Sequence, residues 1–258
     1  MKICLYKIVN VSLLLLLFYC DAEAAGKGPE CVVLLHGLAR TEQSLLKLEH
    51  HLEKHGYCVV NMGYPSREKT VQALSVEAIT TAKARCLAAD ATKIHFVTHS
   101  MGGILVRYYL EHNEVPELGR VVMLSPPNRG SEIVDKLKGT PVFKWINGPA
   151  GQQLGTDAES LPKTLGPPNY EVGIITGDKS INPILSLLIP GKDDGKVSVE
   201  NAKLCGMKDF LVVHKTHPFI MNDEKVLRQV INFIKKGVFD RETDRTNKDR
   251  LCEERTTI

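Results

Sequence analysis

Residues 94–108 have the sequence IHFVTHSMGGILVRY, and this stretch decides the fold class. Its first part, Ile94–Thr98, is a short apolar run that predicts a strand buried on both faces. After a tight turn at Ser100, apolar residues recur at three- and four-residue spacing, which predicts a helix over Met101–His112. A buried strand that turns sharply into a helix is the building unit of an α/β protein.

The same alternation extends along most of the chain. Strand-length apolar runs alternate with helical patterns, which predicts a mostly parallel sheet with helices on both faces. With 258 residues, 43% of them hydrophobic, the chain has enough material for one such domain, which we place at residues 25–239. The predicted strands are Cys31–Leu35, Tyr57–Met62, Ile94–Thr98, Val121–Leu124, Val172–Thr176 and Phe210–Val213. The other predicted helices are Ser44–His55, Val71–Ala89 and Asp223–Lys236.

Between Pro126 and Tyr170 the alternation stops. Glycine and proline are dense there, and only Glu132–Leu137 and Pro141–Ile146 have a weak helical pattern. A long stretch of this kind is either a functional lid or cap loop, which we place at residues 130–168, or a plain connecting excursion. The sequence alone leaves both interpretations open.

The two ends of the chain differ from the rest. Residues 1–24 combine early lysines, the apolar run Leu13–Cys20 and a small-x-small pattern ending at Ala24, which predicts a signal peptide cleaved after Ala24. We therefore expect export to the periplasm or out of the cell. A membrane anchor is the competing interpretation, but the run is shorter than the roughly 20 residues that span a bilayer. Residues 240–258 are charged and are expected to add little to the core.

Charge and cysteine content narrow the possible partners. The formal charge is only +3, and the basic residues are scattered, which argues against a nucleic-acid partner. The five cysteines beyond the signal peptide lack the spacing of a zinc site, so no metal is expected. An exported chain permits disulfides. Cys31 and Cys58 begin neighbouring strands, and Cys86 ends the helix that leads back to the same edge of the sheet, so we expect a Cys58–Cys86 bond.

Ser100 is the candidate nucleophile. A serine on a sharp strand-to-helix turn has a strained backbone and an exposed hydroxyl, and the glycines that follow let strand and helix approach. The helix N-terminus beneath it favours developing negative charge. The usual pattern is Gly-x-Ser-x-Gly, and Thr98 stands where its first glycine would be. The competing interpretation is a serine that merely caps a helix.

A nucleophilic serine in acyl transfer also needs donors for the oxyanion that forms. The first predicted strand ends in His36, Gly37 and Leu38, as in the loop that lends a backbone N–H to the oxyanion hole of such enzymes. We expect the backbone amides of Leu38 and Met101 to be the pair of donors. The alternative is a simple glycine turn with His36 packed in the core.

The base and the acid are expected downstream of the serine, the acid first. Asp194 follows the fifth predicted strand and immediately precedes a glycine, so we prefer it to Asp193 and Asp178. Each candidate lies beyond the carboxyl end of a predicted strand, where open α/β sheets build their sites.

Among the histidines, His217 is preferred as the base. It lies in the loop after the last predicted strand, whereas His214 still belongs to the end of that strand. His99 is adjacent to the serine, but neighbouring residues on such a turn point in different directions.

Together, the segments HGL (36–38), THSMGG (98–103), DGKV (194–197) and TH (216–217) resemble the landmarks of bacterial triacylglycerol lipases and related esterases of the α/β-hydrolase superfamily. The resemblance spans roughly Glu30 to Phe239. It implies an ester hydrolase that works through an acyl-enzyme on an acyl ester or lipid, without a cofactor, and touches a membrane surface transiently. The DGKV segment is similar to the acid-bearing turn of these lipases, which supports Asp194.

Two other functions remain open at this point. The same three residues would also serve an acyltransferase or a thioesterase, since one fold hosts many chemistries. A non-catalytic domain that binds lipid or protein is the third possibility. The predicted lid contains only a small apolar cluster, Val142, Phe143, Trp145 and Ile146, so long-chain triglyceride is one candidate substrate among several.

Overall fold

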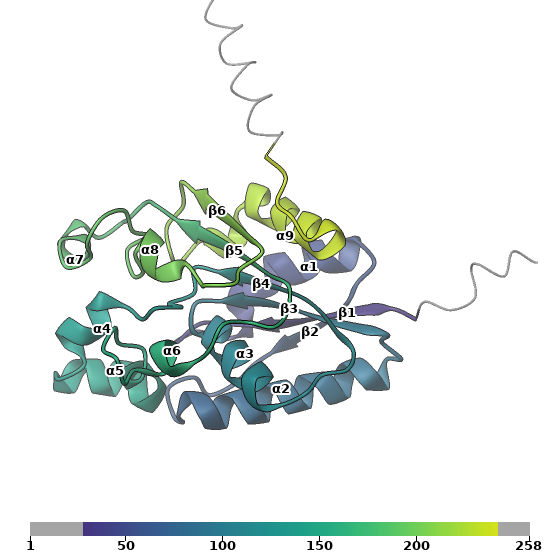
Figure 1. The fold of residues 1–258 in the computed structure, drawn as a ribbon, viewed down its shortest axis with the longest axis horizontal. Helices are drawn as coiled ribbons and strands as arrows, with labels where there is room; N and C mark the ends of the chain where they lie inside the picture. Colours follow the sequence, from purple (N-terminus) through teal and green to yellow (C-terminus); the bar gives the residue numbers. More distant parts are fainter. Residues whose placement is uncertain (1–27, 242–258) are drawn as a thin grey trace, which may run out of the picture.

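The computed structural model describes residues 28–241, which form a six-stranded, fully parallel sheet with helices on both faces (Figure 1). The strand order is β2-β1-β3-β4-β5-β6. All six predicted strands are present, which confirms the predicted fold class. Their bounds are β1 Glu30–Leu35, β2 Cys58–Met62, β3 Lys93–His99, β4 Leu118–Leu124, β5 Val172–Gly177 and β6 Asp209–Val213. The predicted signal peptide and residues 242–258 of the predicted tail lie outside the described residues.

Four helices cover the two faces of the sheet. Helices α2 (Val71–Ala88) and α3 (Met101–His112) pack on one face, and α1 (Leu46–Lys54) and α9 (Glu224–Lys236) pack on the other (Figure 1). Within 28–241, none of the helices has the length and hydropathy to cross a bilayer. The remaining helical elements are η1 Glu42–Leu45, α4 Glu132–Leu137, α5 Pro141–Gln152, α6 Leu161–Thr164, α7 Pro183–Ser186, α8 Val199–Ala202 and η2 Ile220–Asn222.

The sequence of strand β1 does not alternate between polar and apolar residues, because both of its faces are buried. Successive side chains of a strand point to opposite faces, and both faces of this sheet are covered. Val33 and Leu35 pack into the core beneath α2 and α3, while Val32 and Leu34 pack into the core beneath α1 and α9. All four of these positions are therefore apolar. The two cores hold the carboxyl ends of the strands in place.

The predicted Cys58–Cys86 disulfide is wrong, because Cys86 is bonded to Cys31 instead. Cys31 and Cys58 are register partners on the adjacent strands β1 and β2, so both lie near the end of α2. The chain leaves β2, runs through α2 and enters β3, which lies on the far side of β1. The end of α2 must therefore cross over β1, and this places Cys86 above Cys31. Cys58 is a free, partly buried thiol.

Candidate active site

The three side chains predicted for catalysis meet beyond the carboxyl ends of the strands. Ser100 follows β3, Asp194 lies in the connection between β5 and β6, and His217 follows β6. Nε2 of His217 lies 3.0 Å from the hydroxyl oxygen of Ser100, and Nδ1 lies 2.8 Å from Oδ2 of Asp194. The structure thus joins residues separated by up to 117 positions into one hydrogen-bonded chain.

The backbone of Ser100 has the strain expected of an exposed nucleophile. Its φ of 54° and ψ of −123° lie in a region that residues with a side chain rarely adopt. The strain is held by close packing around the turn, since a Cβ on Gly102 would lie only 2.5 Å from the carbonyl oxygen of Leu35. A Cβ on Gly103 would lie 3.1 Å from Cβ of Pro126 and 3.3 Å from the sulfur of Met123, so this glycine also permits close packing at the start of α3. Thr98, which stands in place of the first glycine of the motif, is buried.

Asp194 is fully buried and is stabilised as an anion. Its Oδ1 accepts hydrogen bonds from the backbone N–H groups of Lys196 and Val197, at 3.0 and 2.9 Å. Burial by itself would raise its pKa, but the charge and hydrogen bond of His217 outweigh this effect and lower the pKa below its ordinary value. An ionised carboxylate at this position fixes the orientation of the His217 ring and favours a proton on its Nδ1.

The residues weighed against Asp194 and His217 lie elsewhere. Oδ1 of Asp193 accepts hydrogen bonds from the Ser186 hydroxyl and the Gly195 backbone, so this side chain shapes its own turn. His214 is exposed and pairs with Asp178 at 2.9 Å. Among the described residues, no serine side chain pairs with Asp178 or His214, and both lie outside the lining of the cavity that contains Ser100.

The predicted oxyanion loop packs directly against Ser100. A Cβ on Gly37 would lie 3.1 Å from Cβ of Ser100, so only glycine fits without a shift. Leu38 lines the same cavity as Ser100, and within residues 28–241 its N–H has no hydrogen-bond acceptor. Met101 is the first residue of α3, where a backbone N–H has no partner inside the helix. Both predicted donors are thus available beside the nucleophile.

Tyr64 and His36 hold this loop in place. The two rings are stacked, with centroids 3.9 Å apart and an interplanar angle of 9°. The Tyr64 hydroxyl donates a hydrogen bond to the His36 carbonyl oxygen, and the Tyr64 N–H donates to Nε2 of His36 at 3.4 Å. His36 therefore keeps its proton on Nδ1, which donates to the Gly37 carbonyl at 2.9 Å. The alternative interpretation of His36 as a packed core residue is correct, and this packing orients the loop.

His99 has a supporting position that the sequence did not indicate. It is buried, and its Nε2–H donates a hydrogen bond of 3.0 Å to the backbone carbonyl of His217. Burial is the main cause that lowers the pKa of His99 well below 6.5, and the nearby His217 lowers it further. The ring is therefore neutral. His99 thus anchors the loop that carries His217, and the only sequence signal was its place beside Ser100.

Comparison with known proteins finds similarity at the level of the fold. No protein-family model matches the chain, and no curated protein sequence does. Among solved structures, the mature Bacillus licheniformis lipase BlEst2 is similar at a TM-score of 0.59 and 18% identity, over 81% of this chain and 90% of that one. The chain has the α/β-hydrolase fold.

Two further solved structures share this α/β-hydrolase fold. The metagenomic carboxyl esterase MGS0156 matches at a TM-score of 0.61 and 17% identity, over 76% of this chain and 66% of that one. Lipase B of Aspergillus fumigatus matches at a TM-score of 0.60 and 16% identity, over 81% of this chain and 53% of that one. The propeptide form of BlEst2 matches at a TM-score of 0.61 and 19% identity, over 76% of this chain. The match spans 47% of the length of that BlEst2 form. These similarities establish the shared architecture.

A cavity of about 580 Å³ opens beside the triad of this α/β-hydrolase. Ser100, His217 and Leu38 line it at one side. Its other wall is apolar and comes mainly from α4 and α5, through Ile133, Val134, Leu137, Val142, Phe143, Ile146 and Leu154. An apolar cavity of this size that touches a nucleophile suits an acyl chain.

The predicted lid region forms this apolar wall. Helix α5 runs to Gln152, beyond the predicted end at Ile146, with a kink at Gly148. Arg107 on α3 ties down both ends of the segment, because it donates to the carbonyls of Asn128 at 2.8 Å and Leu165 at 2.9 Å. In the middle of the segment, Trp145 is 80% exposed. The segment is thus fixed at its base and exposes apolar surface at its outer side.

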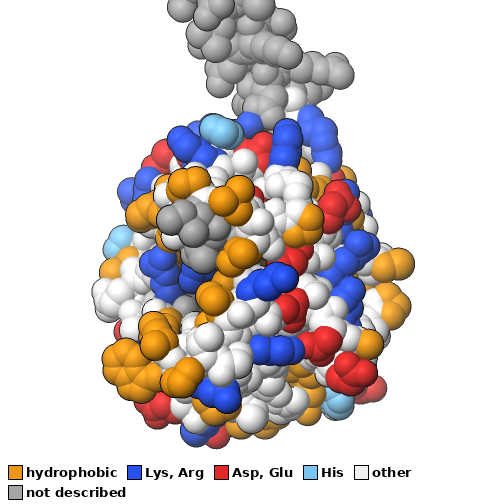
Figure 2. Space-filling view, turned by 90° about the vertical axis from the view of Figure 1, so that its left-hand side faces the viewer, with side chains coloured by type: hydrophobic (Ala, Val, Ile, Leu, Met, Phe, Trp, Pro, Cys, Tyr) orange, Lys and Arg blue, Asp and Glu red, His pale blue; other side chains and the backbone are white. Residues whose placement is uncertain are grey.

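Figure 2 faces the side of the molecule where α4, α5 and α7 lie in Figure 1. Hydrophobic side chains gather there in two groups, and basic side chains lie in the hollow between them. The exposed large apolar residues of this side include Val142, Trp145 and Ile146 on α5, and Ile181 and Leu187 around α7. Apolar side chains of α5 and of the segment around α7 are therefore exposed on this side of the molecule.

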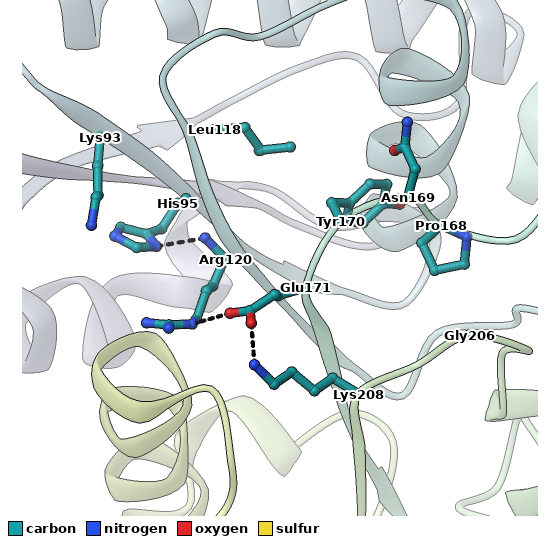
Figure 3. A pocket seen from close by; sticks show the side chains of 11 residues that line it. Lys93, His95, Leu118, Arg120, Pro168, Asn169, Tyr170, Glu171, Gly206 and Lys208 are labelled. Carbon is teal, nitrogen blue, oxygen red and sulfur yellow. Dashed lines mark hydrogen bonds and ion pairs between the residues drawn. The ribbon is translucent and has the colours of Figure 1, made fainter.

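A second and larger cavity, of about 710 Å³, lies at the opposite ends of the strands (Figure 3). Its lining comes from the residues that begin β3 and β4 and precede β5 and β6. Glu171 pairs there with Arg120 and Lys208, and Nδ1 of His95 accepts a hydrogen bond from the Arg120 backbone at 2.8 Å. The described residues of this lining include no serine, threonine or cysteine, and Ser100 lines the other cavity. Residues 28–241 also contain no cluster of side chains suited to a metal ion.

Proposed function

We propose that this protein is a serine hydrolase that cleaves carboxylic esters. The observation that carries the proposal is the hydrogen-bonded chain from Ser100 through His217 to Asp194 at the end of an apolar cavity. The structural neighbours support it at a coarse level, because several are named lipases or esterases.

In the first half of the proposed reaction, the Ser100 oxygen attacks the acyl carbonyl carbon while its proton passes to Nε2 of His217. The negative charge that forms on the carbonyl oxygen is stabilised by the N–H groups of Leu38 and Met101. His217 then donates the proton to the departing alcohol, which leaves an acyl group on Ser100. Asp194 stays ionised and stabilises the imidazolium throughout.

In the second half, water replaces the alcohol. His217 accepts a proton from the water as it attacks the acyl-enzyme, and the same donors stabilise the second oxyanion. Return of the proton to Ser100 releases the carboxylic acid and restores the starting state. The steps balance with the ester and water as the only reactants.

A fluorophosphonate probe tests the nucleophile directly. We expect covalent label on Ser100 in the purified protein, together with Ser100-dependent hydrolysis of a p-nitrophenyl ester. Ser100→Ala should remove both signals, while the matched variant Ser44→Ala, at a partly buried serine whose hydroxyl bonds to the Thr41 carbonyl of its own turn, should keep them. Label on another residue, or turnover that persists in Ser100→Ala, contradicts the proposal. Products formed with added alcohol separate hydrolysis from acyl transfer.

We also propose that the chain is exported. The proposal combines the predicted signal peptide, residues 1–24, with the Cys31–Cys86 disulfide, since such bonds persist in oxidising compartments. N-terminal sequencing of the protein secreted by a producing bacterium tests it, with Ala25 as the expected first residue. A chain that starts at Met1 in the cell fraction contradicts it.

A further inference from the structure

Two cationic side chains line the cavity that contains Ser100 and His217. Arg40 comes from the loop after β1, and Lys196 comes from the turn that carries Asp194. Nη2 of Arg40 donates a hydrogen bond of 3.4 Å to the carbonyl of Pro218, the residue after His217. The backbone N–H of Lys196 donates to Asp194 at 3.0 Å. Arg40 is therefore held beside the triad through its guanidinium, and Lys196 through the backbone of the turn that it shares with Asp194.

These two charges have no carboxylate partner. None of the described residues that line the cavity is an aspartate or a glutamate. Within residues 28–241, neither Arg40 nor Lys196 has a carboxylate oxygen within 4.0 Å, whereas Lys47, Lys69, Arg120, Lys138, Lys208, Lys215 and Arg241 each do. The pKa of Lys196 is lowered by partial desolvation and by repulsion from Arg40, and the charge of Asp194 only partly offsets this. An anion in the cavity would relieve the repulsion between these cations.

The arrangement of the cavity separates an apolar part from a cationic part. The apolar wall comes mainly from α4 and α5, while the cations come from the two loops that also carry Leu38 and Asp194. With the acyl chain against α4 and α5 and the carbonyl carbon at Ser100, the alcohol part of an ester is left on the side of the cations. A guanidinium binds two phosphate oxygens in parallel, and an ammonium adds a third contact.

We propose that Arg40 and Lys196 form an anion subsite, and that the esters this enzyme prefers carry a phosphate group in their alcohol part. The inference rests on the proposed function, because it names the substrate class of the same site. Neutral esters remain substrates, since the triad and the apolar wall act on any acyl ester.

Paired substrates with one acyl chain test the subsite. We compare 1-decanoylglycerol 3-phosphate with neutral 1-decanoylglycerol, both below the concentration at which they form micelles. A hydrogen bond to a charged group contributes about 1.5–3 kcal/mol, so we expect kcat/KM to be higher for the phosphate ester by at least about tenfold. The preference should shrink as salt is added, because salt screens exposed charges. Equal rates, or a preference for the neutral ester, would overturn the proposal.

Two variants separate the subsite from general catalysis. Arg40→Gln and Lys196→Gln should each lower kcat/KM for the phosphate ester by about tenfold and leave the neutral ester much less affected. The matched control Lys192→Gln removes an exposed lysine four positions before Lys196 and should keep the full preference. An equal loss on both substrates would assign Arg40 and Lys196 to folding or general catalysis and refute the subsite.

A binding measurement keeps the subsite testable if neither ester is hydrolysed. Calorimetry with the Ser100→Ala protein should show monodecyl phosphate binding, weakened about tenfold when Arg40→Gln is added. Binding without turnover would refute the proposed function and support the subsite. Absence of binding to Ser100→Ala would refute the subsite, whether or not the neutral ester is cleaved.

Discussion

Nδ1 of His217 donates a hydrogen bond of 2.8 Å to Oδ2 of Asp194, and neither side chain is more than 4% exposed. In Asp194→Asn the amide presents a donor or a neutral acceptor, so His217 loses both its preferred tautomer and the charge that stabilises the imidazolium. We expect kcat for a p-nitrophenyl ester to fall by about 10³–10⁴. The pair of Asp178 and His214, which lies outside the cavity with Ser100, supplies the control, and Asp178→Asn should change kcat less than about threefold. A large loss in the control would contradict the assignment of Asp194.

Gly37 permits the oxyanion loop to touch the nucleophile. In Gly37→Ala the new Cβ would lie 2.9 Å from Nδ1 of His99 and 3.1 Å from Cβ of Ser100. The loop must shift, and a displacement of this kind costs about 10² in kcat. Gly139→Ala is the matched control, because no atom lies within 4 Å of its Cβ. Unchanged kcat in Gly37→Ala would mean that the loop does not contribute a donor.

Trp145 reports on the segment predicted to act as a lid. It is the single tryptophan of the chain and is 80% exposed on α5, so the intrinsic fluorescence comes from this position. If the segment closes over a lipid, adding a long-chain ester to the Ser100→Ala protein should shift the emission maximum to shorter wavelength. Binding detected by calorimetry without a fluorescence shift would show that α5 is a fixed wall.

The Cys31–Cys86 disulfide should contribute strongly to stability. It joins residues 55 positions apart, and the loop-entropy relation gives about 4 kcal/mol for a loop of that size. We expect Cys86→Ala to lower the free energy of unfolding in urea by an amount of this order, and Cys58→Ala to have a smaller effect. Peptide mapping that pairs Cys58 with Cys86 would contradict the structure.

Asp223 makes the stability of the last helix depend on pH. Its side chain caps α9 and pairs with Lys215 at 2.7 Å, and these contacts outweigh burial and lower its pKa from 3.8. A lowered native pKa adds stability above pH 3.8 that is lost as pH falls through the native value. Asp223→Asn keeps a capping side chain but loses the charge, so it should destabilise the protein by about 1 kcal/mol at pH 7 and much less at pH 2. Urea unfolding at the two pH values checks this, and an equal difference at both would contradict it.

Much of the sheet could be predicted because its strands are buried on both faces. Val32 and Val33 point to opposite cores, so the run of apolar residues marks the strand without any partner being known. The Cys58–Cys86 prediction failed for a topological reason, since it ignored that β3 lies beyond β1 and draws the end of α2 across it. The helical backbone of α5 is interrupted at Gly148, where φ is 58° and ψ is −163°, two residues after the predicted end at Ile146, and a second helical turn follows up to Gln152.

The candidate site likewise contains residues that the sequence predicts and residues that it does not. Ser100, Asp194 and His217 have local sequence signals and a known order along the chain, and the structure brings them together. His99 and Tyr64 have no such signal, because their contacts are with backbone atoms of residues that the sequence does not place near them. Arg40 and Lys196 likewise share a cavity only after two loops from different parts of the chain have met.

The positive φ of Ser100 exposes the proposed nucleophile and at the same time lowers the stability of the folded protein. Glycine adopts this conformation without a Cβ penalty, so Ser100→Gly would relieve about 1 kcal/mol of strain while deleting the nucleophile. A laboratory selection for heat resistance alone would therefore tend to discard the hydroxyl on which the proposed reaction depends. Any campaign to make this enzyme more robust has to retain turnover as a second criterion.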